Sequence, residues 1–241
     1  RVIIIGGSGF LGSHLADLLQ EQNYQVTIFD NKKSIYLKKG QKMLVGDIND
    51  INKLNTAIKN NHYVYHFAGM ADIGESNLKP VEAVKKNILG TVNILESCKR
   101  NKVKKIIFAS SIYVYSDQGG VYRSTKQASE LLIENYHTLY KLNFAILRFG
   151  SLYGPRATNT NSIHNFIFQA LKNKKIYRKG NGNEVREYIH VKDAAQASID
   201  ILDSEFDNEH FILTGFNSIK IKDLLNMIKE MLKNKIKVIY T

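Results

Sequence analysis

The stretch IIIGGSGFLGSHLADLL at residues 3–19 joins a run of isoleucines to a glycine-rich turn and then to an amphipathic segment. Its glycines follow the pattern Gly7-x-Gly9-x-x-Gly12, with Gly6 in addition. The apolar run predicts a strand, and the spacing of the leucines that follow predicts a helix. A glycine turn in this setting lets the backbone approach a pyrophosphate, which the free N–H groups of the helix N-terminus then bind. The stretch therefore predicts a dinucleotide-binding unit.

Acidic residues follow the next two predicted strands. Asp30 ends the strand QVTIF, where a carboxylate accepts hydrogen bonds from both hydroxyls of an adenosine ribose and repels a 2′-phosphate. This favours NAD over NADP, although the nearby Lys32 and Lys33 offer charges that can host a phosphate. Asp47, after the third predicted strand, is predicted to hydrogen-bond the adenine. Its alternative interpretation is the N-cap of a helix over INKLNTAI at 51–58.

Short apolar runs alternate with amphipathic segments along the first 150 residues. The predicted strands cover 1–5, 25–29, 42–46, 63–67, 103–110 and 143–149, and the predicted helices cover 10–22, 80–100 and 121–141. This order predicts an α/β fold, a doubly wound parallel sheet of the Rossmann type with helices on both faces. After residue 150 the alternation of predicted strands and helices becomes less regular. We therefore assign 1–150 to an NAD-binding domain that carries the catalytic residues, and 151–241 to a smaller substrate-binding lobe interleaved with the sheet.

The composition narrows the class of protein. The 241 residues are 44% hydrophobic and 23% charged, which is typical of a globular protein with a sizeable core, and no apolar run is long enough to span a membrane. The net charge of +12 comes largely from dispersed lysines, without a basic block that contains interleaved aromatic residues. This favours small anionic substrates over nucleic acid or a membrane surface.

Cysteine and histidine usage excludes other classes. Cys98 is the only cysteine, so no internal disulfide forms, and a buried thiol in a cytoplasmic protein is expected. The seven histidines and this cysteine show no ligand spacing, so no metal site is expected. His66 and His190 lie in apolar strands and are interpreted as core residues. Asn87, in the middle of a predicted helix, either braces backbone near the site or faces solvent.

A candidate reaction centre lies in ASSIYVYSDQGGVYRSTK at 109–126. Tyr122 and Lys126 are four residues apart in a helical segment, so they share one face. A free tyrosine titrates near a pKa of ~10 and is a poor base, whereas a neighbouring ammonium lowers that pKa. Tyr122 is then able to take a proton from a sugar hydroxyl, with Ser111 bonded to the same oxygen. The other tyrosines, Tyr113 and Tyr115, have no lysine at this spacing and are interpreted as packing residues.

The motifs together resemble the extended short-chain dehydrogenase/reductase superfamily, in its NAD-dependent nucleotide-sugar epimerase/dehydratase branch, and the UDP-glucose 4-epimerases within it. They are GGSGFLG at 6–12, FD at 29–30, GDI at 46–48, HFAG at 66–69, SSIYVY at 110–115, YRSTK at 122–126, LRFGSLYGPR at 147–156 and REYIHVKDAA at 186–195. The resemblance implies a catalytic set of Ser111, Tyr122 and Lys126. It also implies a homodimer paired through the helices near 80–100 and 121–141.

The resemblance further implies binding residues. For the cofactor NAD these are Gly6, Gly7, Gly9, Phe10, Leu11, Gly12, Asp30, Asp47, Ile48, Phe67, Ala68, Gly69, Ser110, Tyr122, Lys126 and Phe149. For a nucleotide-diphosphate sugar they are Ser111, Ser151 and Arg186, with Arg186 on the diphosphate. The alternative for Arg186 is a surface ion pair with Glu184 or Glu187. Arg156 is interpreted either as a phosphate ligand or as a structural arginine.

Three departures from the family pattern refine the prediction. Dehydratases of this branch carry Asp-Glu after the catalytic Ser or Thr, whereas this chain has Ile112-Tyr113. Ser151 stands where the family pattern has Asn. The connection from Ser111 to Tyr122 is shorter than is usual in this branch. The chain is therefore predicted to be an NAD-dependent epimerase acting at C4 of the sugar. The alternatives are a 4,6-dehydratase or 4-keto reductase of the same family and, more distantly, a non-catalytic NAD-sensing module. Because the chain begins at Arg1 and such proteins continue past the final KVIYT, we expect sequence to be missing at both ends.

Overall fold

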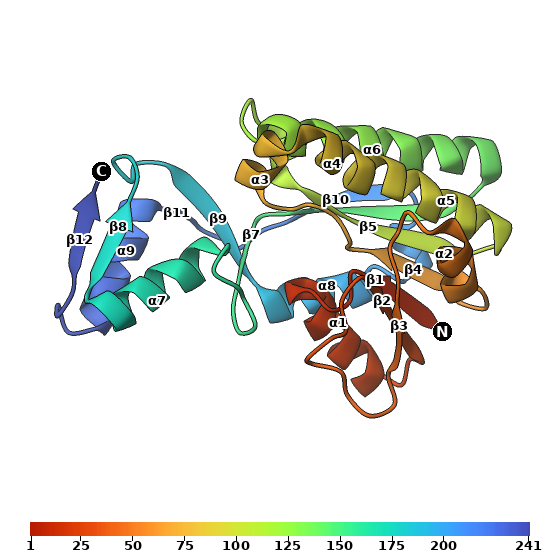
Figure 1. Cartoon of the computed structure of the whole chain (residues 1–241), viewed down its shortest axis with the longest axis horizontal. Coiled ribbons are helices and arrows are strands. Elements are labelled where there is room, and N and C mark those ends of the chain that lie inside the picture. The colour runs from red at the N-terminus through yellow and green to blue at the C-terminus, as the bar shows by residue number, and fades with distance from the viewer. The chain divides into compact units, whose positions relative to one another are not determined.

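The computed structural model describes all 241 residues, which form two compact units (Figure 1). The first unit comprises residues 1–149 and 192–213, and the second comprises 150–191 and 214–241. The chain leaves the first unit after residue 149, and the predicted boundary was at residue 150. The return of residues 192–213 to that unit is a feature that a division by sequence order does not contain. None of the helices has the length and apolar content that crossing a bilayer requires.

A seven-stranded parallel sheet forms the centre of the first unit. Its strands are β1 (Val2–Ile5), β2 (Val26–Asp30), β3 (Lys42–Val45), β4 (Tyr63–His66), β5 (Lys105–Ser111), β6 (Asn143–Phe149) and β10 (Glu209–Leu213). Their order is β10-β6-β5-β4-β1-β2-β3, so the chain winds outward in both directions from β1. Every neighbouring pair is parallel, which confirms the predicted doubly wound Rossmann fold. The crevice where the winding reverses lies at the carboxyl ends of β1 and β4, where such folds bind ligands.

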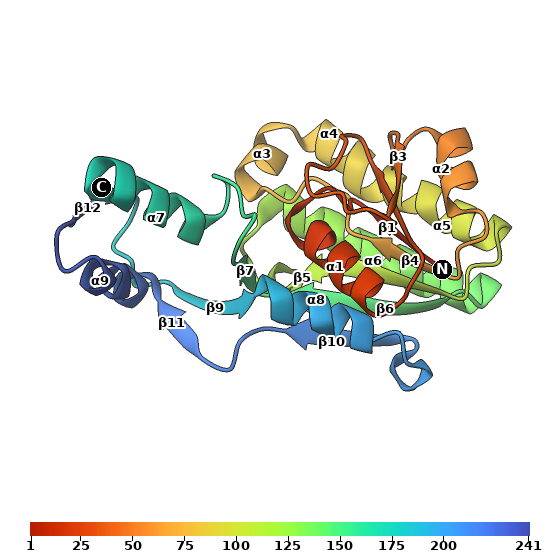
Figure 2. The ribbon, with the colours of Figure 1, turned by 90° about the horizontal axis from the view of Figure 1, so that it is seen from below.

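Helices cover both faces of this sheet. They are α1 (Phe10–Glu21), α2 (Ile51–Ile58), α3 (Ile73–Leu78), α4 (Pro80–Val84), α5 (Gly90–Arg100), α6 (Gly120–Tyr140) and α8 (Val191–Asp200). Helices α1 and α8 lie on one face, and α2, α4, α5 and α6 lie on the other (Figures 1 and 2). With both faces covered, β1 is buried along its whole length, which explains its uninterrupted apolar sequence.

A buried lysine ties the returning segment to the sheet. The Lys105 Nζ, at the start of β5, donates to the backbone oxygens of Ile201 at 2.6 Å and Asp203 at 3.0 Å. It also lies 2.6 Å from the Asp207 carboxylate. These contacts satisfy an ammonium that would otherwise be costly to bury. They anchor the connection between α8 and β10 against the edge of the sheet that β10 completes.

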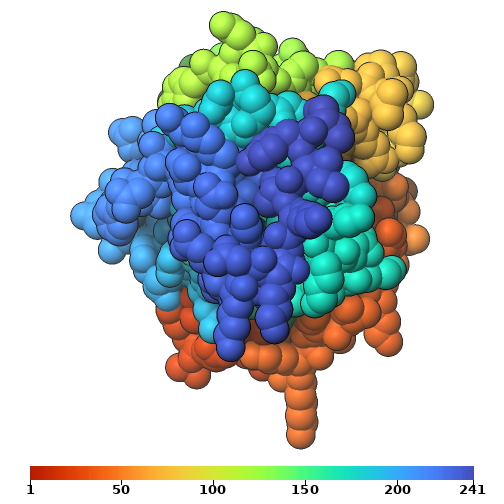
Figure 3. Space-filling model, turned by 90° about the vertical axis from the view of Figure 1, so that its left-hand side faces the viewer, coloured from red at the N-terminus to blue at the C-terminus, as the bar shows by residue number.

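The second unit contains two small sheets and two helices. Its elements are β7 (Ser151–Tyr153), α7 (Ser162–Asn173), β8 (Lys175–Arg178), β9 (Val185–His190), β11 (Ser218–Lys220), α9 (Ile221–Met231) and β12 (Lys237–Tyr240). Strands β11, β9 and β7 form one sheet, and β12 pairs with β8. Phe166 of α7, Ile176 of β8 and Leu225 of α9 share one apolar core. Figure 3 shows α7 in teal beside the dark-blue C-terminal segment. Strands as short as β7 and β8 carry too few residues for a periodic pattern, and the sequence did not predict them.

The helix predicted over 80–100 contains an irregular turn. Residues Lys85–Leu89 form a π-helical turn between α4 and α5, and Asn87 lies within it. The Asn87 Oδ1 accepts from the Met70 N–H at 2.7 Å, and its Nδ2 donates to the Met70 oxygen at 3.1 Å and to Thr125 at 2.9 Å. Asn87 is buried, so of the two sequence interpretations the backbone brace is correct. A π-turn of this kind frequently marks a functional region.

Two left-handed glycines explain the short connection between β5 and α6. A 3₁₀ turn, Ile112–Tyr115, follows β5, and Gly119 and Gly120 then adopt φ angles of 100° and 50°. A Cβ on Gly120 would lie 2.3 Å from the Asn77 Oδ1, which accepts a hydrogen bond from the Val121 N–H at 2.9 Å. The glycines therefore turn the chain into α6 within a few residues, while Asn77 caps the new helix.

We predict that Gly120→Ala lowers the free energy of unfolding by about 2–4 kcal/mol, because it adds backbone strain and displaces the Asn77 cap. Gly40→Ala is the matched control. Gly40 also has a positive φ of 97°, but its Cβ would meet only the flexible end of the Gln20 side chain. The control should cost about 1 kcal/mol. Urea unfolding monitored by circular dichroism measures both, and equal losses would contradict the role of Asn77.

Candidate active site

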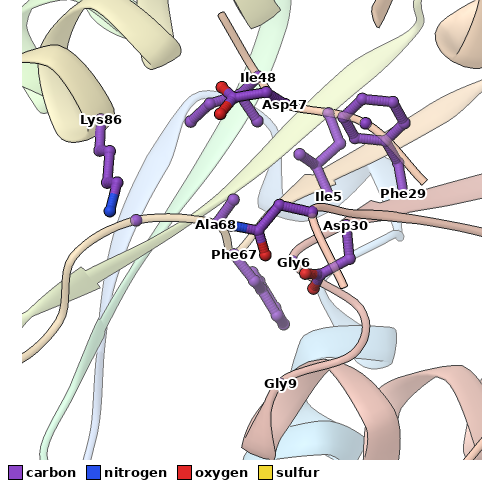
Figure 4. A pocket seen from close by; sticks show the side chains of 13 residues that line it. Ile5, Gly6, Gly9, Phe29, Asp30, Asp47, Ile48, Phe67, Ala68 and Lys86 are labelled. Carbon is purple, nitrogen blue, oxygen red and sulfur yellow. The ribbon is translucent and has the colours of Figure 1, made fainter. Parts of the chain in front are cut away.

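A pocket occupies the crevice at the carboxyl ends of the central strands (Figure 4). Its walls consist of Ile5, Gly6, Gly9, Phe29, Asp30, Asn31, Gly46, Asp47, Ile48, Phe67, Ala68, Gly69 and Lys86. Most of these residues come from the segments that follow β1, β2, β3 and β4. Parallel strands bring their carboxyl ends to one edge, so residues distant in sequence meet here.

The glycine turn packs against the segment after β4 at distances that only glycine permits. Gly6 has a φ of 90°, and a Cβ there would lie 2.5 Å from the Ala68 backbone nitrogen. A Cβ on Gly12 would lie 2.4 Å from the Gly6 oxygen. Helix α1 begins after Gly9, whose missing side chain leaves the first-turn N–H groups without a side-chain cap. The result is a cradle of backbone donors that fits the pyrophosphate of a dinucleotide.

Asp30 is held in place beside this cradle. Its Oδ2 accepts from the Ser8 N–H at 3.0 Å, and its Oδ1 accepts from the Lys32 N–H at 3.1 Å. The carboxylate lines the pocket with oxygen lone pairs to spare, as binding the two hydroxyls of a ribose requires. The side chains of Lys32 and Lys33 are exposed and do not line the pocket. The geometry therefore fits NAD, as the sequence predicted.

Asp47 also lines the pocket and does not cap a helix. Its Oδ1 accepts from the N–H and the side-chain amide of Asn49, at 2.8 and 3.0 Å. Asp50 caps α2 by accepting from the Lys53 N–H at 3.1 Å. The interpretation of Asp47 as the N-cap is therefore wrong: α2 covers the predicted residues Ile51–Ile58, and the residue directly before it is Asp50.

Lys86 is a pocket residue that sequence reasoning missed. It extends from the π-helical turn toward the segment that carries Ala68, and its Nζ lies 2.6 Å from Glu82 (Figure 4). It adds a positive charge to a pocket that fits a diphosphate. No local pattern distinguishes Lys86 from the adjacent Lys85, because only the fold shows which lysine faces the crevice.

The other predicted cofactor residues lie around the pocket or beside it. Phe10 and Leu11 form the first turn of α1, and the Phe67 ring packs edge-on against Phe149 at 6.4 Å between centroids. Gly7 packs against the side chain of Ile28 on β2. Ser110 is not among the pocket-lining residues and directs its hydroxyl to the buried carboxylate of Glu130.

Ser111, Tyr122 and Lys126 come together at the end of β5. The Ser111 hydroxyl lies near enough to Tyr122 to lower the pKa of the phenol, and the Ser111 Oγ accepts from the Tyr113 N–H at 3.3 Å. The Lys126 Nζ donates to the Ala109 oxygen at 2.7 Å and lies 5.9 Å from the centre of the Tyr122 ring. A Cβ on the pocket residue Gly69 would lie 4.0 Å from this ammonium. The three side chains are thus directly beside the cofactor pocket.

Burial dominates the electrostatics of this set. It raises the pKa of Tyr122 to about 12, while the hydrogen bond from Ser111 lowers it and Tyr113 raises it further. Burial also lowers the pKa of Lys126 to about 8, against the opposing effect of Glu130. The sequence predicted a pKa of Tyr122 lowered by Lys126, whereas the pKa of Tyr122 is raised overall. The ammonium is directed to the Ala109 oxygen, and burial of the phenol dominates.

A network of uncharged groups supports the set from behind. The Thr91 hydroxyl donates to the Asn87 oxygen, and its Oγ lies 2.8 Å from the His66 Nε2. Ser129 of α6 donates to the same Asn87 oxygen at 2.9 Å. Burial and the charge of Lys126 lower the pKa of His66 to about 3, so the ring is neutral. This confirms the interpretation of His66 as a core histidine.

The second unit holds the predicted substrate residues Ser151 and Arg186. Ser151 begins β7 and is half-buried. Arg186 lies in β9, donates to the Val185 oxygen at 3.0 Å and forms no ion pair. Glu184 instead pairs with Arg178, so the predicted alternative of a surface ion pair for Arg186 is wrong.

Arg156 and His190, which the sequence also singled out, lie in the second unit. Arg156 is half-buried with a φ of 66°, and the His190 ring lies 5.1 Å from that of Tyr153.

In the whole chain, no group of three or more His, Cys, Asp or Glu side chains is arranged to hold a metal ion. Cys98 is fully buried in the first unit, and burial raises the pKa of its thiol.

Comparison with known proteins agrees with this geometry. Residues 2–213 match the NAD dependent epimerase/dehydratase family, and the chain belongs to that family. A putative UDP-glucose 4-epimerase of Methanocaldococcus jannaschii is 31% identical over 99% of this chain and 85% of its own length. A UDP-glucuronate 4-epimerase of Thermodesulfobacterium geofontis is 29% identical over 98% of this chain and 81% of its own length.

Solved structures show the same fold. UDP-glucose 4-epimerase of Thermotoga maritima, with UDP-glucose, superposes with a TM-score of 0.94 at 26% identity, covering 100% of this chain and 85% of that one. The Thermus thermophilus UDP-glucose 4-epimerase, in complex with NAD, gives 0.90 at 27% identity, covering 99% and 85%. The predicted family, the enzyme class and NAD as the cofactor are confirmed.

We predict that Lys126→Met is more stable than the wild type at pH 7 by up to roughly 3 kcal/mol, because it removes a buried charge. The pKa of Lys126 is about 8 when folded and 10.5 ordinarily, so the folded state binds fewer protons between these values. Wild-type stability therefore rises with pH across that window, and the cost is complete below pH 8. Urea unfolding at pH 7 and pH 10 measures the difference, which should shrink at the higher pH. A difference independent of pH would contradict the prediction.

Proposed function

We propose that the protein is an NAD-dependent nucleotide-sugar epimerase that inverts the configuration at C4 of the sugar. The observation that carries this proposal is the grouping of Ser111, Tyr122 and Lys126 at the end of β5, with the dinucleotide pocket adjacent. It is also the function that the sequence predicts, and the relatives named above as 4-epimerases support it.

In this reaction, the side chains of the protein would act on the 4-hydroxyl group of the sugar. Bound NAD supplies the chemistry of accepting a hydride from the sugar carbon and returning it. Tyr122 takes the proton of the 4-hydroxyl and later gives it back, so no proton is consumed overall. Ser111 bonds the same oxygen, and the charge of Lys126 favours the ionised phenol that this exchange requires.

The turn after Ser111 argues against dehydration. A dehydratase must deliver and remove protons at neighbouring sugar carbons, which calls for acidic side chains beside the catalytic set. The 3₁₀ turn Ile112–Tyr115 contains none, and the Tyr113 ring lies edge-on to Tyr122 at 6.5 Å. The nearest acidic residue along the chain, Asp117, is fully exposed. A reductase remains distinguishable because it must exchange its cofactor in every turnover, whereas an epimerase keeps it.

We further propose that Arg186 binds the diphosphate of the substrate, assisted by Ser151. Its guanidinium has no acidic partner, and arginine binds phosphate oxygens through two parallel hydrogen bonds. UDP-sugars are the first substrates to test, because the named relatives act on or bind them. A substrate class of this kind, together with a single buried thiol, supports a cytoplasmic location.

A homodimer is the proposed assembly. Exposed apolar side chains gather where α3 and α4 lie beside α6: Leu78, Val81 and Val84 on one side and Leu131 on the other. Burying such a patch against a second copy removes apolar surface from water.

We predict that Tyr122→Phe lowers kcat by about 10²- to 10⁴-fold, because the group that exchanges the proton is lost while its ring is kept. Purified enzyme is incubated with UDP-glucose, UDP-galactose, UDP-glucuronate and UDP-N-acetylglucosamine, and products are read by NMR. Tyr140→Phe, at the far end of the same helix, is the matched control and should keep full activity.

Cofactor analysis of the purified wild type completes the test. NAD retained through purification supports the epimerase, whereas an empty site that added NADPH fills supports a reductase. The proposal fails if the wild type converts none of a full panel of UDP- and GDP-sugars, or if Tyr122→Phe converts them at the wild-type rate.

We predict that the wild type sediments as a dimer and that Val81→Glu combined with Leu131→Glu sediments as a monomer, because like charges would then face each other across the pair. Sedimentation equilibrium at micromolar concentration measures this. Phe216→Glu, a fully exposed apolar position in the second unit, is the control and should remain a dimer. A monomeric wild type would reject the assembly.

A further inference from the structure

A buried ion pair lies next to the proposed catalytic set without belonging to it. The Glu130 carboxylate is 5% exposed, and the Arg148 guanidinium binds both of its oxygens, Nε to Oε1 at 3.1 Å and Nη2 to Oε2 at 2.6 Å. The Ser110 hydroxyl donates to the same carboxylate. Arg148 and Ser110 are register partners in β6 and β5, so the pair bridges two strands and helix α6.

Arg148 also holds the turn that follows Ser111. Its Nη1 donates to the Tyr115 hydroxyl, and its guanidinium carbon lies 4.8 Å from the centre of the Tyr115 ring. Tyr115 ends the 3₁₀ turn and is 61% exposed, so little apart from this contact holds it. The interpretation of Tyr115 as a packing residue is therefore incomplete, because its partner is a cation fixed by a buried carboxylate.

The cluster fixes the chain on both sides of Ser111 through hydrogen bonds. Ser110, directly before Ser111, donates a hydrogen bond to Glu130. Tyr115, at the end of the turn after Ser111, accepts a hydrogen bond from Arg148. The position of the Ser111 hydroxyl against Tyr122 therefore depends on groups that contact neither substrate nor cofactor.

Glu130 acts on Lys126 as well. Tyr122, Lys126 and Glu130 are spaced four residues apart along α6, so they share one face of the helix. Of the titratable groups around the Lys126 ammonium, Tyr122 and Glu130 lie on α6 itself, and neutral His66 faces it from β4. Its other neighbours, on β5, are the Phe108 ring and the Ala109 oxygen. Glu130 is the carboxylate whose charge favours the protonated amine.

We propose that Glu130, Arg148 and Tyr115 form a positioning cluster that holds Ser111 against Tyr122 and places a carboxylate one helical turn from Lys126. The positioning role rests on the proposed function, because it concerns the rate at which Tyr122 exchanges its proton. The charge on Lys126 does not depend on which substrate is turned over. Buried ion pairs contribute little net stability compared with apolar replacements, so stability alone is a weak reason for this one.

The test separates charge from position with two variants and a control. Glu130→Gln removes the charge and keeps the size, and Tyr115→Phe removes the hydroxyl that Arg148 binds and keeps the ring. Glu134→Gln is the matched control, since it makes the same change one helical turn further along α6, where Glu134 pairs with His210 at 2.9 Å. Each protein is labelled with ¹³Cε-lysine and titrated by NMR without substrate, the Lys126 signal being assigned by its loss in Lys126→Arg.

We expect the wild-type Lys126 signal to titrate near pH 8 and to titrate at lower pH in Glu130→Gln. We expect kcat on the best UDP-sugar to fall about 10- to 100-fold in Glu130→Gln and Tyr115→Phe, with retained NAD and KM unchanged. Tyr115→Phe should leave the Lys126 titration in place, and Glu134→Gln should alter neither property.

An unchanged Lys126 titration together with an unchanged kcat in Glu130→Gln would overturn the proposal and leave a purely structural ion pair. If Glu130→Gln does not fold, Tyr115→Phe decides, because its side chain is exposed, and a wild-type kcat in that variant overturns the positioning role. If the wild type converts no nucleotide sugar, the proposed function fails, whereas the substrate-free titration still accepts or rejects the role of Glu130.

Discussion

The close approach of the backbone at Gly6 to the segment after β4 links the dinucleotide cradle to the candidate catalytic set. Any side chain at Gly6 would meet the Ala68 nitrogen, and any side chain at Gly12 would meet the Gly6 oxygen. These contacts set the distance between the first turn of α1 and the segment that leads to Gly69. Gly69 in turn lies beside the Lys126 ammonium. The dinucleotide cradle and the candidate catalytic set are therefore parts of one packed region.

Within that region, burial works against the charges that the chemistry needs. It raises the pKa of Tyr122 and lowers that of Lys126, so both side chains are shifted toward their neutral forms. Two features oppose burial: the hydrogen bond from Ser111 to Tyr122 and the carboxylate of Glu130 one turn beyond Lys126. A buried lysine that costs stability is what a site selected for function, rather than for stability, would contain.

Sequence reasoning succeeded where a motif acts through the backbone or through spacing within one element. The glycine pattern at 6–12 predicted the strand, turn and helix, and the four-residue spacing of Tyr122 and Lys126 predicted that they share a helix face. It failed where the outcome depended on contacts between elements. Lys86 was missed, because only the fold shows that it lines the pocket, and the π-helical turn at Asn87 was not predicted, because the Asn87 side chain bonds the distant Met70.

The doubly wound fold, the dinucleotide site and the proposed catalytic residues could all be predicted from the sequence. Periodicity, glycine spacing and helical registers are local properties that can be read from consecutive residues. The tertiary structure was needed to show which tyrosine Arg148 binds, which lysine lines the pocket, and that the Ser110 hydroxyl bonds Glu130. Those choices depend on the register between β5 and β6 and on the seating of α6, which bring together residues that lie far apart along the chain.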